Sequence, residues 1–209
     1  MGKLFSNVIT DYISRAQNAK KEIEVELLRK SIHALIAFVP VLASLNSTFT
    51  MVLLGTGIVL YAFSETLRVN GRKVAVISTL TVAASREKDS MSFVLGPVTL
   101  VIGAMAALLF YPEPAASIAI YALAFGDSVS SIFGKVFGRV RIAFLNGKTL
   151  AGSLACLVTV FAVTYRITGL AQASLIIGLA AALFEAAPTG DMDNIIIPIG
   201  TGFFAYMLL

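Results

Sequence analysis

The sequence predicts an all-α membrane protein, a bundle of about seven transmembrane helices with one additional short helix. Its composition is the first reason: the 209 residues are 57% hydrophobic and only 13% charged, whereas soluble domains carry roughly 25% charged residues. The mean hydropathy of +0.87 agrees with this. The distribution is the second reason, because the apolar residues gather in runs and the bases gather in a few of the connections between them.

Residues 1–30 are predicted to form an amphipathic cytoplasmic helix ahead of a single transmembrane catalytic domain, residues 31–209. Apolar side chains recur at helical spacing between polar ones, at Leu4, Phe5, Val8, Ile9, Tyr12 and Ile13. A helical lead-in to the first span explains the same pattern equally well. The segment is too polar for the apolar part of a secretory signal, so none is predicted.

Eight apolar runs follow, some of which need flanking residues to reach the roughly 20 that a span requires. They are Ser31–Leu45, Phe49–Phe63, Val74–Ala84, Ser92–Tyr111, Ala115–Gly134, Leu150–Tyr165, Leu170–Phe184 and Ile195–Leu209. The third is short and is enclosed by Lys73 and Arg86. We predict that it is re-entrant or buried, which leaves seven crossings.

The bases predict the orientation of the chain. Every Lys and Arg except Arg166 lies in the N-terminal segment or in the connections after the second, third and fifth runs. If the third run does not cross, these connections share one face, which the positive-inside rule makes cytoplasmic. We therefore expect a multi-pass protein of a prokaryotic cell membrane, with its N-terminus and active site on the cytoplasmic face. Membrane placement also explains the pI near 9.3, and no nucleic-acid partner is expected.

A carboxylate stands at the end of the fifth apolar run, in the stretch Gly126–Ser153. Asp127 is interpreted as a divalent-metal ligand or as the base that takes a proton from a hydroxyl, because ionisable groups near membrane depth are usually functional. The alternative is a cap on a cytoplasmic helix, a position that favours Asp. The residues alone leave both interpretations open.

Glycines alternate with bases after Asp127. Bases and bare glycine backbone can approach phosphate oxygens, so the predicted phosphate-binding residues are Gly134, Lys135, Gly138, Arg139, Lys148, Thr149 and Gly152. A P-loop is excluded because the preceding strand and the required glycine spacing are absent. The G-x-x-x-G spacing of Gly134 and Gly138 is also typical of helix packing in membranes, and this alternative stays open.

Three acids lie within nine positions near the last apolar run: Glu185, Asp191 and Asp193. Such a group is stabilised by solvent or by a bridging cation. Magnesium, which takes one or two carboxylates together with substrate phosphates, fits this pattern. A solvated acidic turn around Pro188 and Gly190 is the alternative.

Two further groups have structural interpretations. His33, the single histidine, is more typical of a hydrogen bond between membrane helices than of catalysis. Glu65 and Arg68 lie three residues apart, the helical spacing for an ion pair.

Taken together, these residues resemble the polyprenol kinase family, which includes dolichol kinase, phytol kinase and a CTP-dependent diacylglycerol kinase. The resemblance covers Arg29 to the C-terminus and consists of four motifs in the order of the family. They are Arg29, Lys30 and His33 at the first span; Gly126, Asp127, Gly134, Gly138 and Arg139; Lys148, Thr149, Gly152 and Ser153; and Glu185, Pro188, Asp193, Asn194, Ile197 and Pro198.

The resemblance implies transfer of the terminal phosphoryl group of a nucleoside triphosphate, CTP in this family, to the hydroxyl of an isoprenoid alcohol or diacylglycerol. Phosphoryl transfer needs a donor held in line, cations on the transferring oxygens and a positioned hydroxyl. The implied catalytic residues are Asp127, Lys148 and Asp193. Asp127 orients or deprotonates the hydroxyl, a role that Asp193 could exchange with it. Lys135, Arg139 and Lys148 hold phosphates, Asn194 joins the nucleotide site, and magnesium binds Asp193 with Glu185 or Asp127. Accessory residues are Arg29, Lys30, His33, Glu65 and Arg68.

Two other functions remain open at this point. A related cytidylyltransferase making a CDP-lipid would share much of this layout. A small transporter is disfavoured because its ionisable groups would lie at mid-bilayer. The small-residue faces Gly55/Gly57, Gly178/Ala182 and Gly200/Gly202 suit contacts within or between chains, so a homodimer is also considered.

Overall fold

The computed structural model describes residues 20–72, 92–138, 140 and 148–209, which form helices joined by loops, without a strand among them. The first helix runs from Lys20 to Leu45, and its last part is a 3-10 turn, Leu35–Phe38, followed by α2. The helices that carry labels are α2 (Val39–Leu45), α3 (Ser47–Val69), α5 (Gly96–Phe110), α6 (Ala115–Tyr121), the π-helical η3 (Ala122–Gly126), α7 (Asp127–Phe137), α8 (Leu150–Thr168), α9 (Ala171–Ala186), the 3-10 turn η4 (Gly190–Met192) and α10 (Asp193–Leu208).

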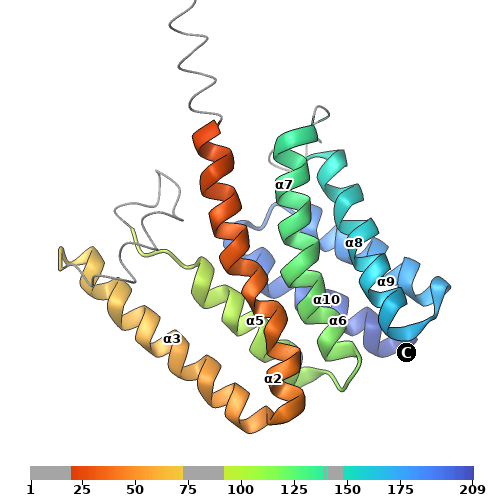
Figure 1. The fold of residues 1–209 in the computed structure, drawn as a ribbon, viewed down its shortest axis with the longest axis horizontal. Helices are drawn as coiled ribbons and strands as arrows, with labels where there is room; N and C mark the ends of the chain where they lie inside the picture. The colour runs from red at the N-terminus through yellow and green to blue at the C-terminus, as the bar shows by residue number, and fades with distance from the viewer. Residues whose placement is uncertain (1–19, 73–91, 139, 141–147) are drawn as a thin grey trace, which may run out of the picture.

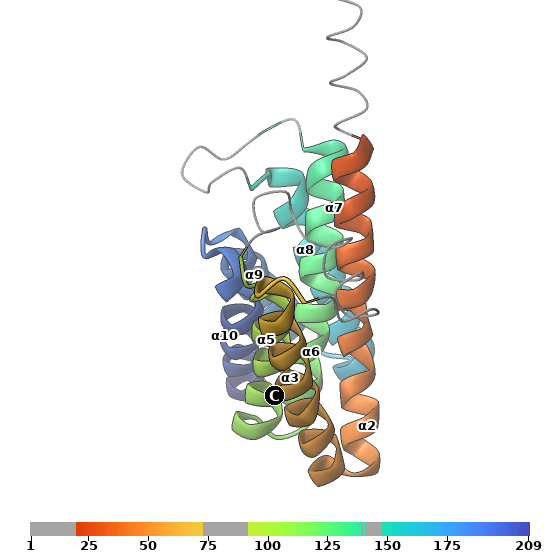
Figure 2. The same ribbon diagram turned by 90° about the vertical axis from the view of Figure 1, so that its left-hand side faces the viewer.

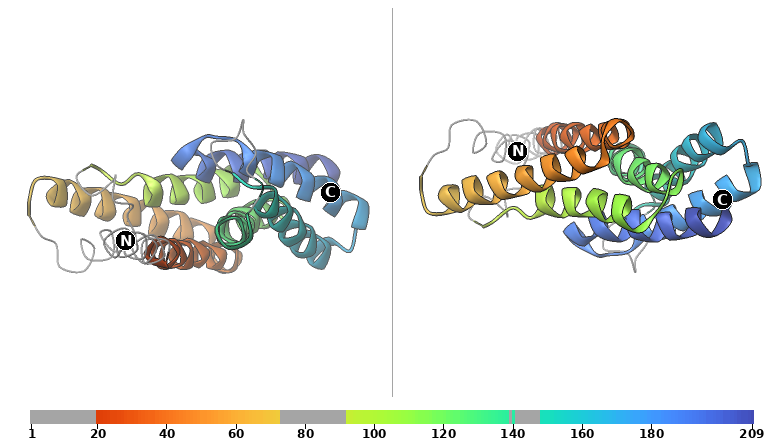
Figure 3. Two further views of the ribbon diagram at one scale, coloured as in Figure 1. Left: turned by 90° about the horizontal axis from the view of Figure 1, so that it is seen from above. Right: turned by 90° about the horizontal axis from the view of Figure 1, so that it is seen from below.

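Successive helices run in opposite directions, so the connections alternate between the two ends of the bundle (Figure 1). The helix Lys20–Leu45 lies beside α7 in both side views (Figures 1 and 2). On its other side α7 contacts α8, which in turn contacts α9. Viewed along the helices, α3 lies at one end of an elongated section and α8 with α9 at the other (Figure 3). The helix α10 packs against α5, α6 and α9.

Four helices are long and apolar enough to cross a membrane: Lys20–Leu45, Ser47–Val69, Ala115–Phe137 and Leu150–Thr168. Two shorter apolar helices, Gly96–Phe110 and Ala171–Ala186, accompany them. Together with α10, these helices coincide with seven of the eight predicted apolar runs. The prediction of an all-helical membrane protein is thereby confirmed, while the number of crossings and their orientation stay predictions.

The remaining predicted run, Val74–Ala84, which is the third along the chain, lies outside the described residues, and so does the amphipathic pattern of Leu4 to Ile13. The two flanks of the third run nevertheless meet. Arg68 Nη2 at the end of α3 donates a hydrogen bond to the Ser92 carbonyl (2.6 Å), and Glu65 Oε1 accepts one from the Val94 amide (2.9 Å). The chain therefore leaves α3 and enters α5 at the same end of the bundle. The ion pair expected of Glu65 and Arg68 forms within this contact.

A π-helical turn interrupts the long helix Ala115–Phe137 immediately before Asp127. The preceding residue, Gly126, has helical dihedral angles (φ −59°, ψ −53°), and the helix continues to Phe137. The interpretation of Asp127 as a helix cap is therefore wrong, because its own backbone lies inside a continuous helix. π-helical turns of this kind are frequent at functional sites.

At Gly103 the backbone of α10 lies close against α5, and we expect the replacement of this glycine to destabilise the protein. A Cβ at this position would lie 2.0 Å from the Asn194 carbonyl oxygen, a backbone atom that cannot rotate away. We expect Gly103→Ala to lower the free energy of unfolding in detergent by about 2–3 kcal/mol. The matched control is Gly55→Ala on α3, where a Cβ meets nothing within 4 Å and helix propensity favours Ala by roughly 1 kcal/mol. Equal melting temperatures for the two variants would contradict this packing.

Candidate active site

A polar cavity of about 560 Å³ opens at the end of the bundle where α7 meets α8. Its walls come from the helix Lys20–Leu45, α7, the start of α8 and the connection from α9 to α10. The side chains and backbone that define it are Glu22, Ile23, Glu26, Arg29, Ser130, Ser131, Gly134, Lys135, Gly138, Lys148, Thr149, Gly152, Glu185, Ala187, Pro188, Thr189, Gly190, Asp191 and Asp193. Its volume lies within the range of roughly 300–1,000 Å³ that is usual for small-molecule sites.

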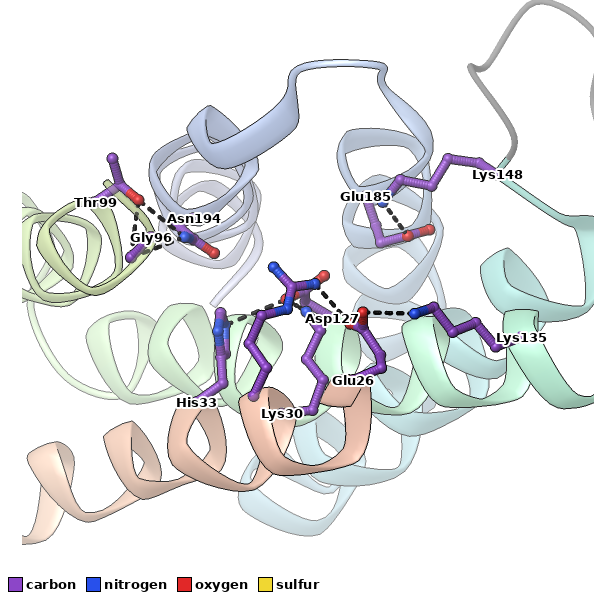
Figure 4. A network of polar contacts seen from close by, with 11 residues as sticks. Glu26, Lys30, His33, Gly96, Thr99, Asp127, Lys135, Lys148, Glu185 and Asn194 are labelled. Carbon is purple, nitrogen blue, oxygen red and sulfur yellow. Dashed lines mark hydrogen bonds and ion pairs between the residues drawn. The ribbon is translucent and has the colours of Figure 1, made fainter. Parts of the chain in front are cut away.

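Asp127 lies fully buried beside this cavity, with a side chain that is 1% exposed. The Lys30 ammonium donates a hydrogen bond to Asp127 Oδ2, and His33 Nε2 lies 3.2 Å from the same oxygen (Figure 4). The His33 contact lacks the geometry of a hydrogen bond, and Asp127 Oδ1 has no partner among the described residues. Buried polar atoms are normally paired. The carboxylate therefore offers one oxygen to a ligand.

Glu26 joins this site although the sequence reasoning did not select it. Its carboxylate, 4% exposed, accepts a hydrogen bond from Arg29 Nη2 (2.6 Å) and lies 2.9 Å from Lys135 Nζ. The sequence left residues 1–30 as either an amphipathic surface helix or a helical lead-in to the first span. The described part agrees with a lead-in, because the helix Lys20–Leu45 passes residue 30 without a break. The spacing of Glu26, Lys30 and His33, which puts them on one helix face, was the available signal.

Lys148 meets an acid from the other side of the bundle. Its Nζ donates a hydrogen bond to Glu185 Oε1 at 2.6 Å (Figure 4). Burial alone would lower the pKa of the Lys148 ammonium, but the charge of Glu185 and their hydrogen bond outweigh it, and the pKa lies above its ordinary value. Lys148 is therefore charged at neutral pH.

The glycines of this stretch bring α7 against the start of α8. A Cβ at Gly134 would lie 2.9 Å from Thr149 Oγ1, and one at Gly138 would lie 2.5 Å from Thr149 Cγ2. A Cβ at Gly152 would lie 2.9 Å from the Ser130 carbonyl oxygen. The helix-packing interpretation of Gly134 and Gly138 is therefore correct, and Gly152 packs in the same way. The three glycines also line the cavity, and their binding of phosphate stays a prediction.

The three acids proposed for magnesium do not form one cluster. Among the residues that the structure describes, no three His, Cys, Asp or Glu side chains are grouped so as to hold a metal ion. Glu185 is engaged by Lys148, while Asp193 lines the cavity. Burial, followed by the nearby charge of Asp127, raises the pKa of Asp193 to about 6. A cation next to Asp193 would relieve both effects.

Other predicted site residues lie elsewhere. The Asn194 amide donates to the Gly96 carbonyl (3.2 Å) and to Thr99 Oγ1 (2.9 Å), which fastens α10 to α5. It does not line the cavity, and its contact with nucleotide stays a prediction. Arg139 lies outside the described residues.

Comparison with known proteins supports an isoprenoid-alcohol kinase-like family. The chain is 32% identical over 158 residues, 67% of its length, to "Probable phytol kinase 1, chloroplastic" of Glycine max. It is 26% identical over 159 residues, 68% of its length, to "Phytol kinase 1, chloroplastic" of Arabidopsis thaliana. No family model matches the chain, and no solved structure matches it.

These relatives are longer proteins, of which the matched part covers 52%. Their names place them in chloroplasts, so they do not support a prokaryotic cell membrane or a cytoplasmic site, which stay predictions. The chain thus spans about half the length of the curated relatives it matches, and over two-thirds of its own length it is similar to phytol kinases.

Proposed function

We propose that this chain is a membrane kinase that transfers the terminal phosphoryl group of a nucleoside triphosphate to the hydroxyl of an isoprenoid alcohol. The observation that carries the proposal is Asp127, buried with one unpartnered oxygen beside a cavity that holds three basic side chains, Arg29, Lys135 and Lys148. The similarity to phytol kinases supports an isoprenoid acceptor. The proposed donor is CTP, on the strength of the motif resemblance alone.

The donor's phosphates would occupy the polar cavity. Each basic side chain there now contacts a carboxylate of the protein, Lys148 that of Glu185 and Arg29 and Lys135 that of Glu26. A phosphate group offers the same charge-assisted hydrogen bonds. The two glutamates therefore keep the bases in position until phosphates take over some of their contacts. The glycine backbone at Gly134, Gly138 and Gly152 adds a wall without side chains.

The acceptor hydroxyl would reach Asp127 Oδ1. As the oxygen of the alcohol bonds to the γ-phosphorus and the bond to the departing diphosphate breaks, the hydroxyl proton passes to this oxygen. Lys30 donates a hydrogen bond to Oδ2 and His33 lies against the same oxygen, which leaves Oδ1 to the substrate. They act as positioning residues, since they fix the carboxylate rather than the reacting atoms.

A divalent cation is the cofactor proposed here, and magnesium is the first choice. Asp193 would hold it together with phosphate oxygens of the donor, because one or two carboxylates suffice when the substrate completes the coordination. When bound, the ion would neutralise charge on the phosphates.

A donor-by-acceptor assay tests the proposed function. Purified protein in detergent with magnesium is offered nucleotides labelled in the γ- or α-phosphate, each with phytol, geranylgeraniol, dolichol or diacylglycerol. We expect label from the γ-position of CTP to appear in an isoprenoid lipid and CDP to be released. Label from the α-position in the lipid, with release of pyrophosphate, would instead identify a CDP-lipid synthase. The absence of transfer for every pair would contradict both.

A further inference from the structure

A second cavity, which the proposed chemistry does not use, lies further along the same helices. This apolar groove has a volume of about 730 Å³. Three helices form its walls, together with neighbouring residues. They contribute Ala34, Ala37 and Val41 of the helix Lys20–Leu45, Tyr121 just before the π-turn and Phe125 near its end, and Ala162 of α8. All three of these helices also line the polar cavity.

The groove begins one helical turn from the contacts that Lys30 and His33 make with Asp127. Ala34 lies four residues after Lys30 and Ala37 four residues after His33, so these side chains share one face of the helix Lys20–Leu45. The side chains of His33 and Asp127 are in contact at 3.2 Å. From Ala34 the groove extends along its helix as far as Val41, a distance of roughly 12 Å at the usual rise of helical residues. It therefore covers less than half of a hydrocarbon core of about 30 Å.

The lining fits a hydrocarbon chain. Tyr121 and Phe125 stack on each other with ring centres 5.8 Å apart, and both rings line the groove. Alanines from two facing helices, Ala34 and Ala37 opposite Ala162, leave space for methyl branches. Phe38 and Val41 are 63% and 54% exposed, so the groove is open at its side, where a lipid can enter from the bilayer.

We propose that this groove binds the hydrocarbon tail of the isoprenoid alcohol, with the hydroxyl directed to Asp127. This inference rests on the proposed function, and it adds the residues that recognise the lipid. The two linings favour the arrangement. The polar cavity holds three bases and five acids and so suits phosphates together with a cation, whereas among the described residues that line the groove only Arg166, near the end of α8, is charged. A tail longer than the groove continues into the surrounding lipid.

Substitutions that fill the groove provide the kinetic test. We expect Ala37→Phe and Ala162→Phe to raise KM for phytol at least tenfold and to leave kcat and KM for a five-carbon prenyl alcohol within twofold of the unaltered protein. Ala171→Phe is the matched control, since Ala171 is exposed on α9 and does not line the groove. If the protein phosphorylates phytol and all three variants keep the same KM, the groove is not the tail site, although the kinase function stands.

A cross-linking experiment tests the groove without relying on catalysis. A photoreactive isoprenoid alcohol is added to the protein in nanodiscs without nucleotide, and labelled peptides are identified by mass spectrometry. We expect label in residues 34–41, 121–125 and 162–167, competed by phytol and reduced in Ala37→Phe. Label spread evenly over the exposed apolar faces would indicate bulk lipid. Loss of a dimer in Ala37→Phe without a change in labelling would indicate a second copy of the chain. Either result overturns the proposal.

If the unaltered protein phosphorylates no alcohol, the proposed function fails, and the labelling pattern alone then decides whether the groove binds such lipids.

Discussion

Asp127→Asn is expected to lower kcat for transfer to the isoprenoid alcohol by about 10³-fold. Positioned proton transfer contributes typically 10²–10⁴ to the rate, and Asn cannot accept the proton. The change also leaves the buried Lys30 ammonium without its partner, which is expected to lower the free energy of unfolding by about 3–5 kcal/mol. Phosphate transfer at saturating substrate and thermal unfolding in detergent measure the two effects separately.

A second variant separates lost chemistry from lost stability. Lys30→Met combined with Asp127→Asn removes both charges, so the melting temperature should recover while kcat stays low. The matched carboxylate control is Glu113→Gln, an exposed residue in the connection between α5 and α6, at the opposite end of the bundle. Recovery of transfer in the double variant would show that Asp127 acts only through the fold.

Lys148→Met is expected to reduce kcat/KM for the nucleotide by about 10²–10³-fold, as removal of one aligned donor to developing charge does in other enzymes. The loss follows from the geometry of the cavity, where the charged Lys148 ammonium lies 2.6 Å from Glu185 and faces the proposed phosphates. Because the Glu185 carboxylate is only 1% exposed, leaving it unpaired should also destabilise the protein by about 3–5 kcal/mol.

The double variant Lys148→Met with Glu185→Gln should melt near the unaltered protein and remain inactive. Lys20→Met serves as the control, because Lys20 is exposed and its ion pair with Glu24 is a surface contact, which contributes roughly 0–1 kcal/mol. A kcat/KM for the nucleotide that is unchanged in Lys148→Met would remove Lys148 from the phosphate site. Direct measurement of nucleotide binding by calorimetry distinguishes weaker binding from slower transfer.

The sequence predicted the helices and the polar residues of the site because both follow from local composition. Apolar runs such as Ala115–Gly134 become helices in a bilayer, since no other open arrangement satisfies the backbone. A carboxylate such as Asp127 next to such a run is energetically costly without a partner. Asp127 could therefore be predicted as a site residue from the sequence alone. The glycines near Lys135 and Lys148 were selected because bare backbone beside a base can approach phosphate oxygens.

The tertiary structure decided which residues meet. Glu26, which the sequence left in either a surface helix or a lead-in to the first span, is buried against Arg29 and Lys135. Glu185 contacts Lys148 and Asn194 fastens α10 to α5, while the predicted magnesium role of Glu185 stays a prediction.

Such pairings join residues far apart in the chain, 97 positions in the case of Lys30 and Asp127. They depend on how far each helix is rotated and on the π-turn before Asp127, which changes the direction of every later side chain on that helix. Composition determines that charges in a membrane protein find partners, whereas helix packing determines which partners they find.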